Sequence, residues 1–477
     1  MHGPSAMRAE AAAGVRYSAL SMRKRFDRRR GWGVALLLLA LFAVGCGPAR
    51  ERPDLILVTV DTLRADHLGA YGHAAARTPH VDALAQRGVI FQHATTPYPR
   101  TTPALATLLT GLWPHHHGAR GAGIPLQNGR TLGQVLQPLG YVSVGISASR
   151  VAGRKEKLDQ GFDVFVAKSE LEHWRSRVVT AEALERAAEV PRSKPLFLWV
   201  HYMEPHWPYR PPAHLDPGPE ADPCRRLMAA RDSGELSRIA VIRNQGGVSE
   251  GAVEACKRLY DAEIENTDAA VGELLAGLER QGRLANGYVV FTADHGENFG
   301  ESGSFYQHGE NVHDASLRVP LIVAGPGVTP GVDHGAIRLE DVVPSVLGLL
   351  EVPGPERPVT DGVDLSARLR GTVARGPDSG PIAFGSSAKP DPRERTARTP
   401  RFKLVDRRMP DGTTRRELYD LENDPGETLD VSGEHPDVAL RLARELDVWS
   451  EDVPYFDETA DLDRDQRERL RALGYVD

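Results

Sequence analysis

Short, uninterrupted apolar runs recur along the chain, and stretches with helical periodicity separate them. DLILVTV at 54–60, PLFLWV at 195–200 and GYVVFTA at 287–293 have the length and composition of strands that are buried on both faces of a parallel sheet. Apolar residues at helical spacing predict helices near 177–189 and 252–282. This alternation predicts an α/β fold with a mostly parallel central sheet flanked by helices.

Weaker segments continue the same alternation. A helix is predicted near 131–138, and YVSVGI at 141–146 and PLIVAG at 320–325 have the character of strands. DVVPSVLGLLEV predicts a helix over 341–352. The stretch 353–399 is rich in Pro, Gly, Arg and Asp, which predicts loop and linker structure.

The last hundred residues predict a separate small subdomain with α+β character. RFKLVDR and RRELYDL flank the turn-like MPDGTT, a pattern that is typical of a β-hairpin. Two charged helices are expected to follow, over 436–450 and 463–473. We therefore expect a main domain over 54–370 and a C-terminal subdomain over 371–477.

The N-terminal segment has the features of a secretory signal. A basic run, RKRFDRRR at 23–30, precedes the apolar stretch GWGVALLLLALFAVG and then Cys46. This stretch is shorter than a comfortable membrane span. A Cys directly after small residues resembles the cleavage site of bacterial lipoproteins. That resemblance implies a signal peptide over 1–45, a lipid on Cys46 and a tether over 46–53. Ordinary cleavage and an uncleaved anchor are the alternatives.

Charge then limits the partners. The chain has 477 residues, 41 % hydrophobic residues and a formal net charge of −7. Loss of residues 1–45 removes eight basic and two acidic groups, so the mature chain carries −7 − 6 = −13. No basic patch follows the first 30 residues, which argues against nucleic-acid binding. An acidic chain is not attracted to anionic headgroups, so we expect the lipid to hold it to the bacterial cell envelope, facing the periplasm or the cell surface.

The mature chain keeps two further cysteines, Cys224 and Cys256. Both lie in a polar insertion over 213–256. In an exported protein such a pair permits one disulfide. Two free thiols are the alternative.

Polar residues with metal-binding chemistry follow the predicted strands. Asp61 comes directly after the first strand, and Asp294 and His295 follow the strand at 287–293. In open α/β sheets, ligands bind outside the carboxyl ends of the strands. Two carboxylates and an imidazole suit one divalent metal ion, and the imidazole favours Zn or Mn over a pure Ca site. Taken singly, an Asp after a strand, such as Asp61, is more often a helix cap or a turn former.

Thr101 is the candidate nucleophile. It opens the helical stretch ALATLLTG, and the free N–H groups of a helix N-terminus stabilise a tetrahedral anion. A hydroxyl beside a metal can attack phosphorus or sulfur in line. His206 and His308 are candidates to bind the substrate or to protonate the leaving oxygen. A simple N-cap is the alternative role for Thr101, and Thr102 competes for that role.

Several motifs in order make the chain resemble the sulfatase branch of the alkaline-phosphatase superfamily over nearly all of residues 52–430. By that resemblance Asp61, Asp294 and His295 would be metal ligands. Thr101 would be the nucleophile and a fourth ligand, and His206 and His308 would bind substrate. The matching segments are VTVDTLRADHLGAYG (58–72), TTPALATLLTGLWPHHHG (101–118), HYMEPHWPY (201–209), FTADHGENFGE (291–301), QHGENVHDASLRVPLIV (307–323) and ELYDLENDPGE (417–427).

Departures from the family pattern bear on the reaction. Sulfatases carry Cys or Ser, which is oxidised to formylglycine, where this chain has Thr101. Leu105 replaces an anion-binding Arg, Thr62 replaces the second Asp of a pair, and GISASRVAG at 145–153 replaces a Lys-Trp-His segment. A Thr nucleophile is usual in phosphodiesterase and phosphoethanolamine-transferase relatives, and the stretch from Asp294 onward resembles the transferases.

We therefore expect an exported, metal-dependent hydrolase of anionic esters, with phosphate monoesters and diesters favoured over sulfate esters. One alternative is a transferase that moves a phosphate-containing headgroup onto an envelope lipid or glycan. A catalytically inactive binding protein is the other. A second metal would need further ligands, for which only His206, His308 and Glu204 are at hand.

Overall fold

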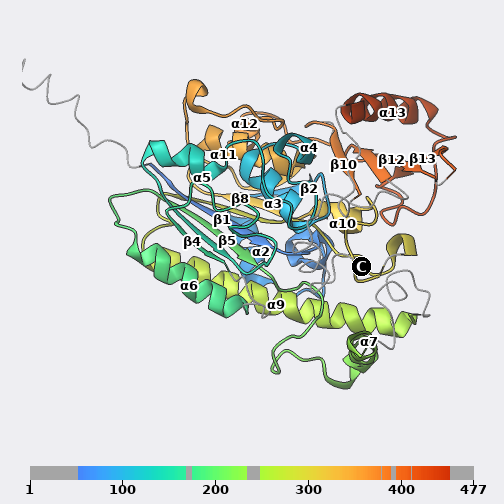
Figure 1. The fold of residues 1–477 in the computed structure, drawn as a ribbon, viewed down its shortest axis with the longest axis horizontal. Helices are drawn as coiled ribbons and strands as arrows, with labels where there is room; N and C mark the ends of the chain where they lie inside the picture. The colour runs from blue at the N-terminus through green and yellow to red at the C-terminus, as the bar shows by residue number, and fades with distance from the viewer. Residues whose placement is uncertain are drawn as a thin grey trace, which may run out of the picture. The chain divides into compact units, whose positions relative to one another are not determined.

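A mixed β-sheet forms the centre of the chain from Arg52 onward, and this part of the chain clusters as one compact unit (Figure 1). The computed structural model describes residues 52–167, 175–233, 248–303, 305–377, 379–387, 394–409 and 411–451. The predicted signal segment 1–45, the lipidation site Cys46 and the predicted helix 463–473 lie outside these residues. Within them, no helix combines the length and apolar content that a membrane crossing requires.

The three long apolar runs form the middle of this sheet. β1 (Asp54–Val60) lies between β5 (Leu196–Tyr202) and β6 (Gly287–Ala293) and runs parallel to both. Every residue of the three strands is buried, which explains why their sequences are continuously apolar. The nine strands lie in the order β4 (Val164–Ala167), β3 (Val142–Ser147), β5, β1, β6, β8 (Leu321–Ala324), β2 (Val89–Thr95) and β7 (Arg318–Val319), with β9 (Gly331–Arg338) also paired to β2.

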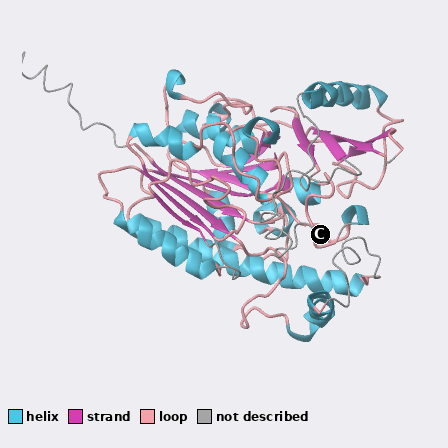
Figure 2. Cartoon of the chain, viewed as in Figure 1, coloured by secondary structure: helices cyan, strands magenta, loops and turns pink. Residues whose placement is uncertain are grey.

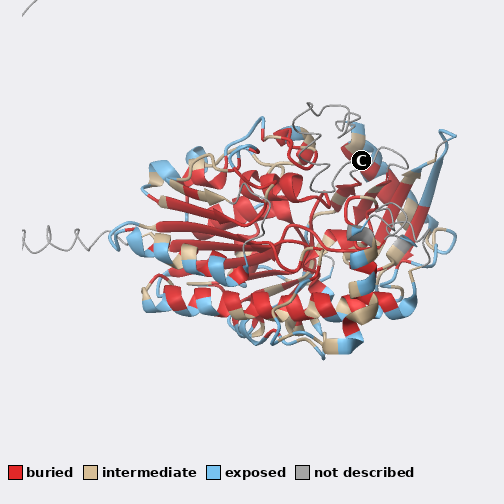
Figure 3. Ribbon diagram, turned by 60° about the horizontal axis from the view of Figure 1, so that its bottom comes forward, coloured by how far each residue is buried: buried red, intermediate tan, exposed pale blue. Residues whose placement is uncertain are grey.

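Helices cover both faces of the sheet. Figure 1 shows α6 and α9 along one side and α5, α11 and α12 along the other, and Figure 2 shows the strands enclosed between these two layers. The burial pattern in Figure 3 agrees, because the strands are buried and the outward faces of the helices are exposed. The helices are α2 (Pro79–Gln86), α3 (Thr101–Thr110), α4 (Pro114–His117), α5 (Leu132–Leu136), α6 (Ser176–Glu189), α7 (Asp222–Asp232), α9 (Glu250–Arg280), α10 (Asp314–Leu317), α11 (Val342–Leu349), α12 (Ser366–Leu369) and α13 (Pro436–Glu451).

A second, four-stranded antiparallel sheet is built from the C-terminal part, in the order β10 (Ala383–Ser386), β11 (Glu394–Arg398), β12 (Phe402–Arg408) and β13 (Thr414–Asp420). β12 and β13 form the predicted hairpin. α13 packs on this sheet and buries an apolar cluster that includes Leu404, Leu418, Leu442 and Leu446. The domain boundary near residue 370 stays a prediction, because the chain from Arg52 onward clusters as one unit.

One prediction of local structure was wrong. The stretch 353–399 is not simply loop and linker, since it contains α12, β10 and β11. The predicted strand at 320–325 is present as β8, and it runs antiparallel to β6 within the mostly parallel sheet. A buried run shows that both faces of a strand are covered, but it carries no information on strand direction.

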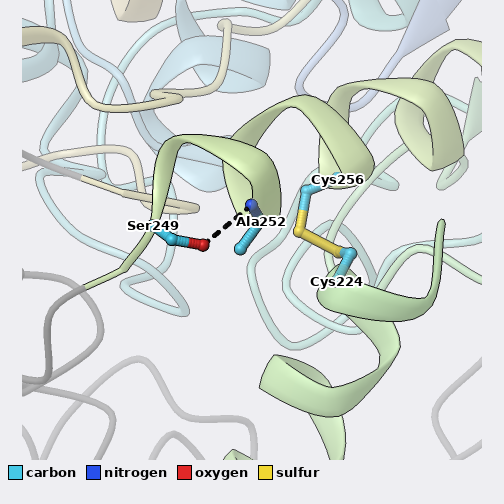
Figure 4. Close-up of a disulfide and its surroundings, with 4 residues drawn as sticks. All are labelled: Cys224, Ser249, Ala252 and Cys256. Carbon is cyan, nitrogen blue, oxygen red and sulfur yellow. Dashed lines mark hydrogen bonds between the residues drawn. A yellow bond between two sulfur atoms is a disulfide. The ribbon is translucent and has the colours of Figure 1, made fainter. Parts of the chain in front are cut away.

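The polar insertion is attached to α9 by a disulfide. Cys224 on α7 and Cys256 on α9 are bonded; they are 32 positions apart in sequence, and their Cα atoms are 5.0 Å apart (Figure 4). The structure therefore has the bridge rather than two free thiols. Ser249 caps the same helix, because its hydroxyl accepts a hydrogen bond from the N–H of Ala252.

Candidate active site

Asp61, Asp294 and His295 meet at the carboxyl ends of two neighbouring strands. One side-chain ligand atom from each lies within 4.8 Å of the others, and all three residues are buried. In the register of β1 and β6, Val60 lies opposite Ala293, so the next residue of each strand brings a carboxylate to the same place. The expected cluster is therefore present.

A strained turn follows Asp61. Thr62 has φ 56°, a left-handed conformation that is costly for a β-branched residue and is found where the surroundings enforce it. The turn directs the N–H of Thr62 toward Oδ1 of Asp294, 3.2 Å away. Tyr260 of α9 holds this turn from outside. Its hydroxyl donates to the carbonyl oxygen of Thr62 (2.7 Å) and accepts the N–H of Arg64 (2.9 Å).

A backbone hydrogen bond fixes the tautomer of His295. Nδ1 lies 3.0 Å from the carbonyl oxygen of Gly296. A carbonyl only accepts, so Nδ1 carries the proton and Nε2 presents a lone pair. Nε2 lies 3.4 Å from Oδ2 of Asp294 and 3.8 Å from Oδ1 of Asp61. This is the arrangement of a metal-binding histidine held by a carbonyl group behind it.

Thr101 points into the same cluster. It is the first residue of α3, and its Oγ1 lies 3.4 Å from Nε2 of His295 and 3.5 Å from Oδ2 of Asp61. Arg100, rather than Thr101 or Thr102, occupies the N-cap position. The hydroxyl of Thr102 instead donates to the carbonyl oxygen of Val151 (2.6 Å). The N-cap alternative for Thr101 is therefore wrong, and its hydroxyl is available to the carboxylate and histidine cluster.

Burial shifts the titration of both carboxyl groups of the cluster. In the metal-free protein, burial raises the pKa of Asp61 to about 7, and burial together with the charge of Asp61 raises the pKa of Asp294 to about 6. Oδ1 of Asp61 and Oδ2 of Asp294 are buried and find no hydrogen-bond donor in the described residues. Buried carboxylate oxygens without donors are costly unless a cation binds them.

The spacing also fits one divalent ion. Ligand distances of roughly 2.0–2.6 Å place two ligands of one ion at most about 5 Å apart, and the three atoms satisfy this limit. Oxygen and nitrogen donors suit Zn, Mn or Ca. The residues present therefore fit a single divalent cation, and Thr101 lies close enough to be a fourth ligand.

His308 lies beside His295, and His206 lies beside His308; the substrate-binding roles predicted for them stay predictions. The rings of His308 and His295 have centroids 4.2 Å apart, and those of His206 and His308 are 5.3 Å apart. Nδ1 of His206 donates to the carbonyl oxygen of Trp207 (2.6 Å), which fixes the tautomer of this ring. The two histidines thus border the same space as Thr101.

The sequence placed His201 and Glu297 after predicted strands, as residues able to hold a metal or an anion, but neither was included among the predicted site residues. Glu297 is fully buried, and its Oε1 lies 3.5 Å from Nδ1 of His308. His201, at the end of β5, has Nε2 3.6 Å from Oδ2 of Asp61. The strand-end position of His201 was a usable signal. Nothing in the local sequence indicated that Glu297 would contact His308.

Glu204 is not a metal ligand. Its carboxylate accepts hydrogen bonds from Arg175 (2.7 Å), from the N–H and hydroxyl of Ser176 (3.0 and 2.5 Å) and from Asn266 (2.9 Å). These donors occupy both oxygens, so Glu204 anchors α6 and α9 to the loop that carries His206. Of the three groups considered for a second metal, this one is excluded.

Comparison with known proteins agrees with this geometry. A family model described as Sulfatase matches residues 53–352, a span that contains every residue of the cluster. The chain belongs to the sulfatase family. Members of this family typically bind a divalent metal ion. The buried cluster of Asp61, Asp294 and His295 has the ligand types and the spacing that such an ion needs.

Individual relatives are distant. An arylsulfatase of Clostridium perfringens is 24 % identical over 368 residues, which are 64 % of this chain and 76 % of the relative. A phosphonate monoester hydrolase of Agrobacterium radiobacter is 21 % identical, with a TM-score of 0.66 over 84 % of this chain and 96 % of the other. A structure solved in complex with its substrate D-glucosamine-2-N,6-O-disulfate is 20 % identical, with a TM-score of 0.67 over 84 % and 98 %. The structures show a shared alkaline-phosphatase-like fold, and the family assignment makes this chain an ester hydrolase of the sulfatase type.

Proposed function

We propose that the protein is an exported, metal-dependent hydrolase that cleaves anionic esters through a covalent intermediate on Thr101. Phosphate monoesters and diesters are favoured over sulfate esters, because the side chain is a threonine hydroxyl that acts directly as the nucleophile. The observation that supports the proposal most strongly is the position of Oγ1 of Thr101, 3.4 Å from Nε2 of His295 and 3.5 Å from Oδ2 of Asp61.

The reaction needs two displacements at phosphorus or sulfur. A divalent cation on Asp61, Asp294 and His295 would supply charge that acidifies a neighbouring hydroxyl and neutralises the nonbridging oxygens. Thr101 loses its proton to solvent, and its Oγ1 forms a bond to phosphorus or sulfur while the bond to the leaving oxygen breaks. That oxygen takes a proton from His206 or His308. Water then gives a proton to the same histidine and attacks phosphorus or sulfur, the bond to Oγ1 breaks, and Oγ1 takes a proton from solvent.

Helix α3 contributes to the binding of the transferred group. Thr101 and Thr102 are the first two residues of the helix, where backbone N–H groups lack acceptors within the helix. A tetrahedral anion is stabilised at such a position by these groups and by the helix dipole. Catalysis then depends mainly on groups placed where negative charge increases.

Export to the bacterial envelope and a lipid on Cys46 belong to the same proposal. The disulfide between Cys224 and Cys256 supports an oxidising compartment, since such bonds are rare in the cytosol. The acceptor of the transferred group is proposed to be water. A transferase acting on an envelope lipid or glycan is distinguished by the experiment below.

The proposal is tested on metal-loaded mature protein with aryl phosphomonoesters, phosphodiesters, phosphonate monoesters and sulfate esters. Thr101→Ala is compared with Thr110→Ala, which removes a buried hydroxyl at the far end of the same helix, where it donates to the carbonyl oxygen of Ala106 and accepts the N–H of Leu112. We expect kcat/KM to fall on the order of a thousandfold or more in the first variant and to stay unchanged in the second. Turnover that survives in Thr101→Ala contradicts the covalent step.

Rapid quenching followed by peptide mass spectrometry identifies the modified residue. A phosphoryl or sulfuryl adduct on Thr101 that decays at the same rate with and without added glycan or lipid acceptors supports the hydrolase. An adduct whose decay requires an acceptor identifies a transferase. Intact anion binding without any turnover identifies the inactive binding protein.

A further inference from the structure

The residue before Thr101 carries a fully buried guanidinium group. Arg100 is 0 % exposed, and a guanidinium group this deeply buried keeps its charge only where the surrounding groups stabilise it. It is the N-cap of α3 with extended backbone (φ −147°, ψ 140°), and its carbonyl oxygen accepts the N–H of Ala104 at 3.0 Å. The first turn of the helix thus fixes its backbone one residue from the nucleophile.

The side chain of Arg100 reaches toward the loop that carries His308. A Cβ atom placed on Gly309 would lie 2.5 Å from Nε and 2.8 Å from Cζ of Arg100. Gly309 has φ +93°, so glycine is required there for its backbone as well as for the close approach. The guanidinium therefore packs against the backbone next to His308, whose ring is 4.2 Å from that of His295.

The carboxyl groups at the centre give a cation beside His308 a role. Asp61, Asp294 and Glu297 are three carboxyl groups with 0 % exposure, and a sulfate or phosphate ester brings more negative charge into the same space. One divalent ion offsets two of these charges. Leu105, one turn along α3, is fully buried in the apolar core, so the following turn of the helix supplies no cation.

We propose that Arg100 binds the nonbridging oxygens of the sulfate or phosphate group that Thr101 attacks, an inference that rests on the proposed function. The planar guanidinium donates parallel hydrogen bonds that match two oxygens of a tetrahedral anion. Arg100 thereby orients the phosphorus or sulfur in front of Oγ1. It also offsets the charge that increases on these oxygens in the transition state.

Three variants test this. Arg100→Met keeps the length of the side chain and removes the charge. Arg100→Lys keeps the charge and loses the planar pair of N–H donors. Arg368→Met is the matched control, because Arg368 is also buried and pairs with Asp333 on β9, away from the catalytic cluster. It measures what the loss of a buried guanidinium costs in stability alone.

Activity is measured on aryl phosphodiesters and sulfate esters, and anion binding by the thermal shift of metal-loaded protein with inorganic phosphate or inorganic sulfate. We expect Arg100→Met to lose roughly 10²–10³ in kcat/KM and to lose the stabilisation by both anions, with its metal content unchanged. Arg100→Lys should lie between it and the wild type. Arg368→Met should keep kcat/KM and the anion response, with a lower melting temperature.

If the wild type is active and Arg100→Met has the same kcat/KM and the same anion response, the role of Arg100 is overturned and the proposed function stands. If the wild type turns over no ester, but binds the anions and Arg100→Met does not, the proposed function alone is overturned. If Arg100→Met does not fold, Arg100→Lys decides by the same two measurements.

Discussion

The hydroxyl of Tyr260 is hydrogen-bonded to the backbone on both sides of Leu63, accepting from the N–H of Arg64 and donating to the carbonyl oxygen of Thr62. Thr62 carries the left-handed turn that follows Asp61. A residue of α9 thus holds the turn that directs a backbone N–H toward Asp294. The relationship gives Tyr260 a role in positioning the metal cluster, although it contacts no ligand atom.

We therefore predict that Tyr260→Phe weakens metal retention. Without the hydroxyl, no hydrogen bond from Tyr260 holds Thr62 in its left-handed conformation. The metal affinity should then fall roughly tenfold, which is the smaller end of the losses seen when a group that supports a metal ligand is removed. Tyr209→Phe is the control, since the hydroxyl of Tyr209 has no hydrogen-bond partner in the described residues and its ring lies 5.6 Å from that of Tyr260. Equal metal affinity of the two variants, measured by competition with a chelator, would contradict the prediction.

Metal removal should destabilise the protein in a pH-dependent way. In the metal-free protein the pKa values of Asp61 and Asp294 are raised to about 7 and about 6, mainly by burial, from a model value of 3.8. Raised values mean that the contribution to stability is present below about pH 4 and is lost as the pH rises through 6–7. A cation restores it, because it binds the ionised forms.

The rise in melting temperature on adding Zn²⁺ or Mn²⁺ should therefore be larger at pH 8 than at pH 5.5, where protons compete for the same oxygens. Scanning calorimetry of chelator-treated protein with and without metal measures this difference. Asp294→Asn should abolish most of the metal response at both pH values. A metal response that is as large at pH 5.5 as at pH 8 would exclude these carboxylates as the ligands.

Asp268 on α9 stabilises the start of α2, and its loss should cost stability. Its carboxylate accepts the N–H groups of His80 (3.2 Å) and Val81 (2.8 Å). Each of the two carboxylate oxygens accepts one of these hydrogen bonds, and Asp268→Asn keeps only one such oxygen. We therefore expect the free energy of unfolding to fall by about 1 kcal/mol. Denaturant unfolding at several pH values measures it.

The pH dependence of that loss has a definite sign. Burial raises the pKa of Asp268 to about 6, so the wild-type contribution is full below about pH 4 and declines as the pH rises through 6. Asparagine does not titrate, and the deficit of the variant should shrink between pH 5 and pH 8. A deficit that grows over this interval would mean that Asp268 is stabilised as the charged form.

Reduction of the disulfide should loosen the insertion. The bridge closes a segment of 32 residues between α7 and α9, for which loop-closure entropy gives about 3–4 kcal/mol. Cys224→Ser with Cys256→Ser should lower the stability of this segment and speed proteolysis within 213–256, while the metal affinity stays unchanged because the ligands follow β1 and β6. Limited proteolysis with and without reductant measures this. Identical cleavage rates would show that the bridge does not restrain the insertion.

The sequence predicted the central strands and the cluster because both depend on local pattern. Asp61 and Asp294 end buried apolar runs, and parallel strands bring such ends together. Other features depend on contacts between distant segments. The antiparallel direction of β8 is set by β6 and β2, and no apolar pattern encodes direction.

The strands β10 and β11 were missed for a similar reason. β11 reads ERTAR, and its buried charged residues form ion pairs, Glu394 with Arg407 on β12 and Arg398 with Asp314. Hydrophobic periodicity does not find a strand of this kind. The hydrogen bond from Tyr260 to Thr62 could not be predicted either, because the two residues are 198 positions apart in sequence.

Asp61 and Asp294 belong to adjacent strands, so the hydrogen bonds of the β1–β6 ladder set the spacing between them. Exposed loops within the 232 residues that separate them in sequence can therefore change in length without altering this spacing. The segments that carry Thr101, His206 and Tyr260 are the exception, because they belong to the centre or support it. Insertions and deletions in homologous chains should accordingly accumulate in the exposed loops and leave these segments at constant length.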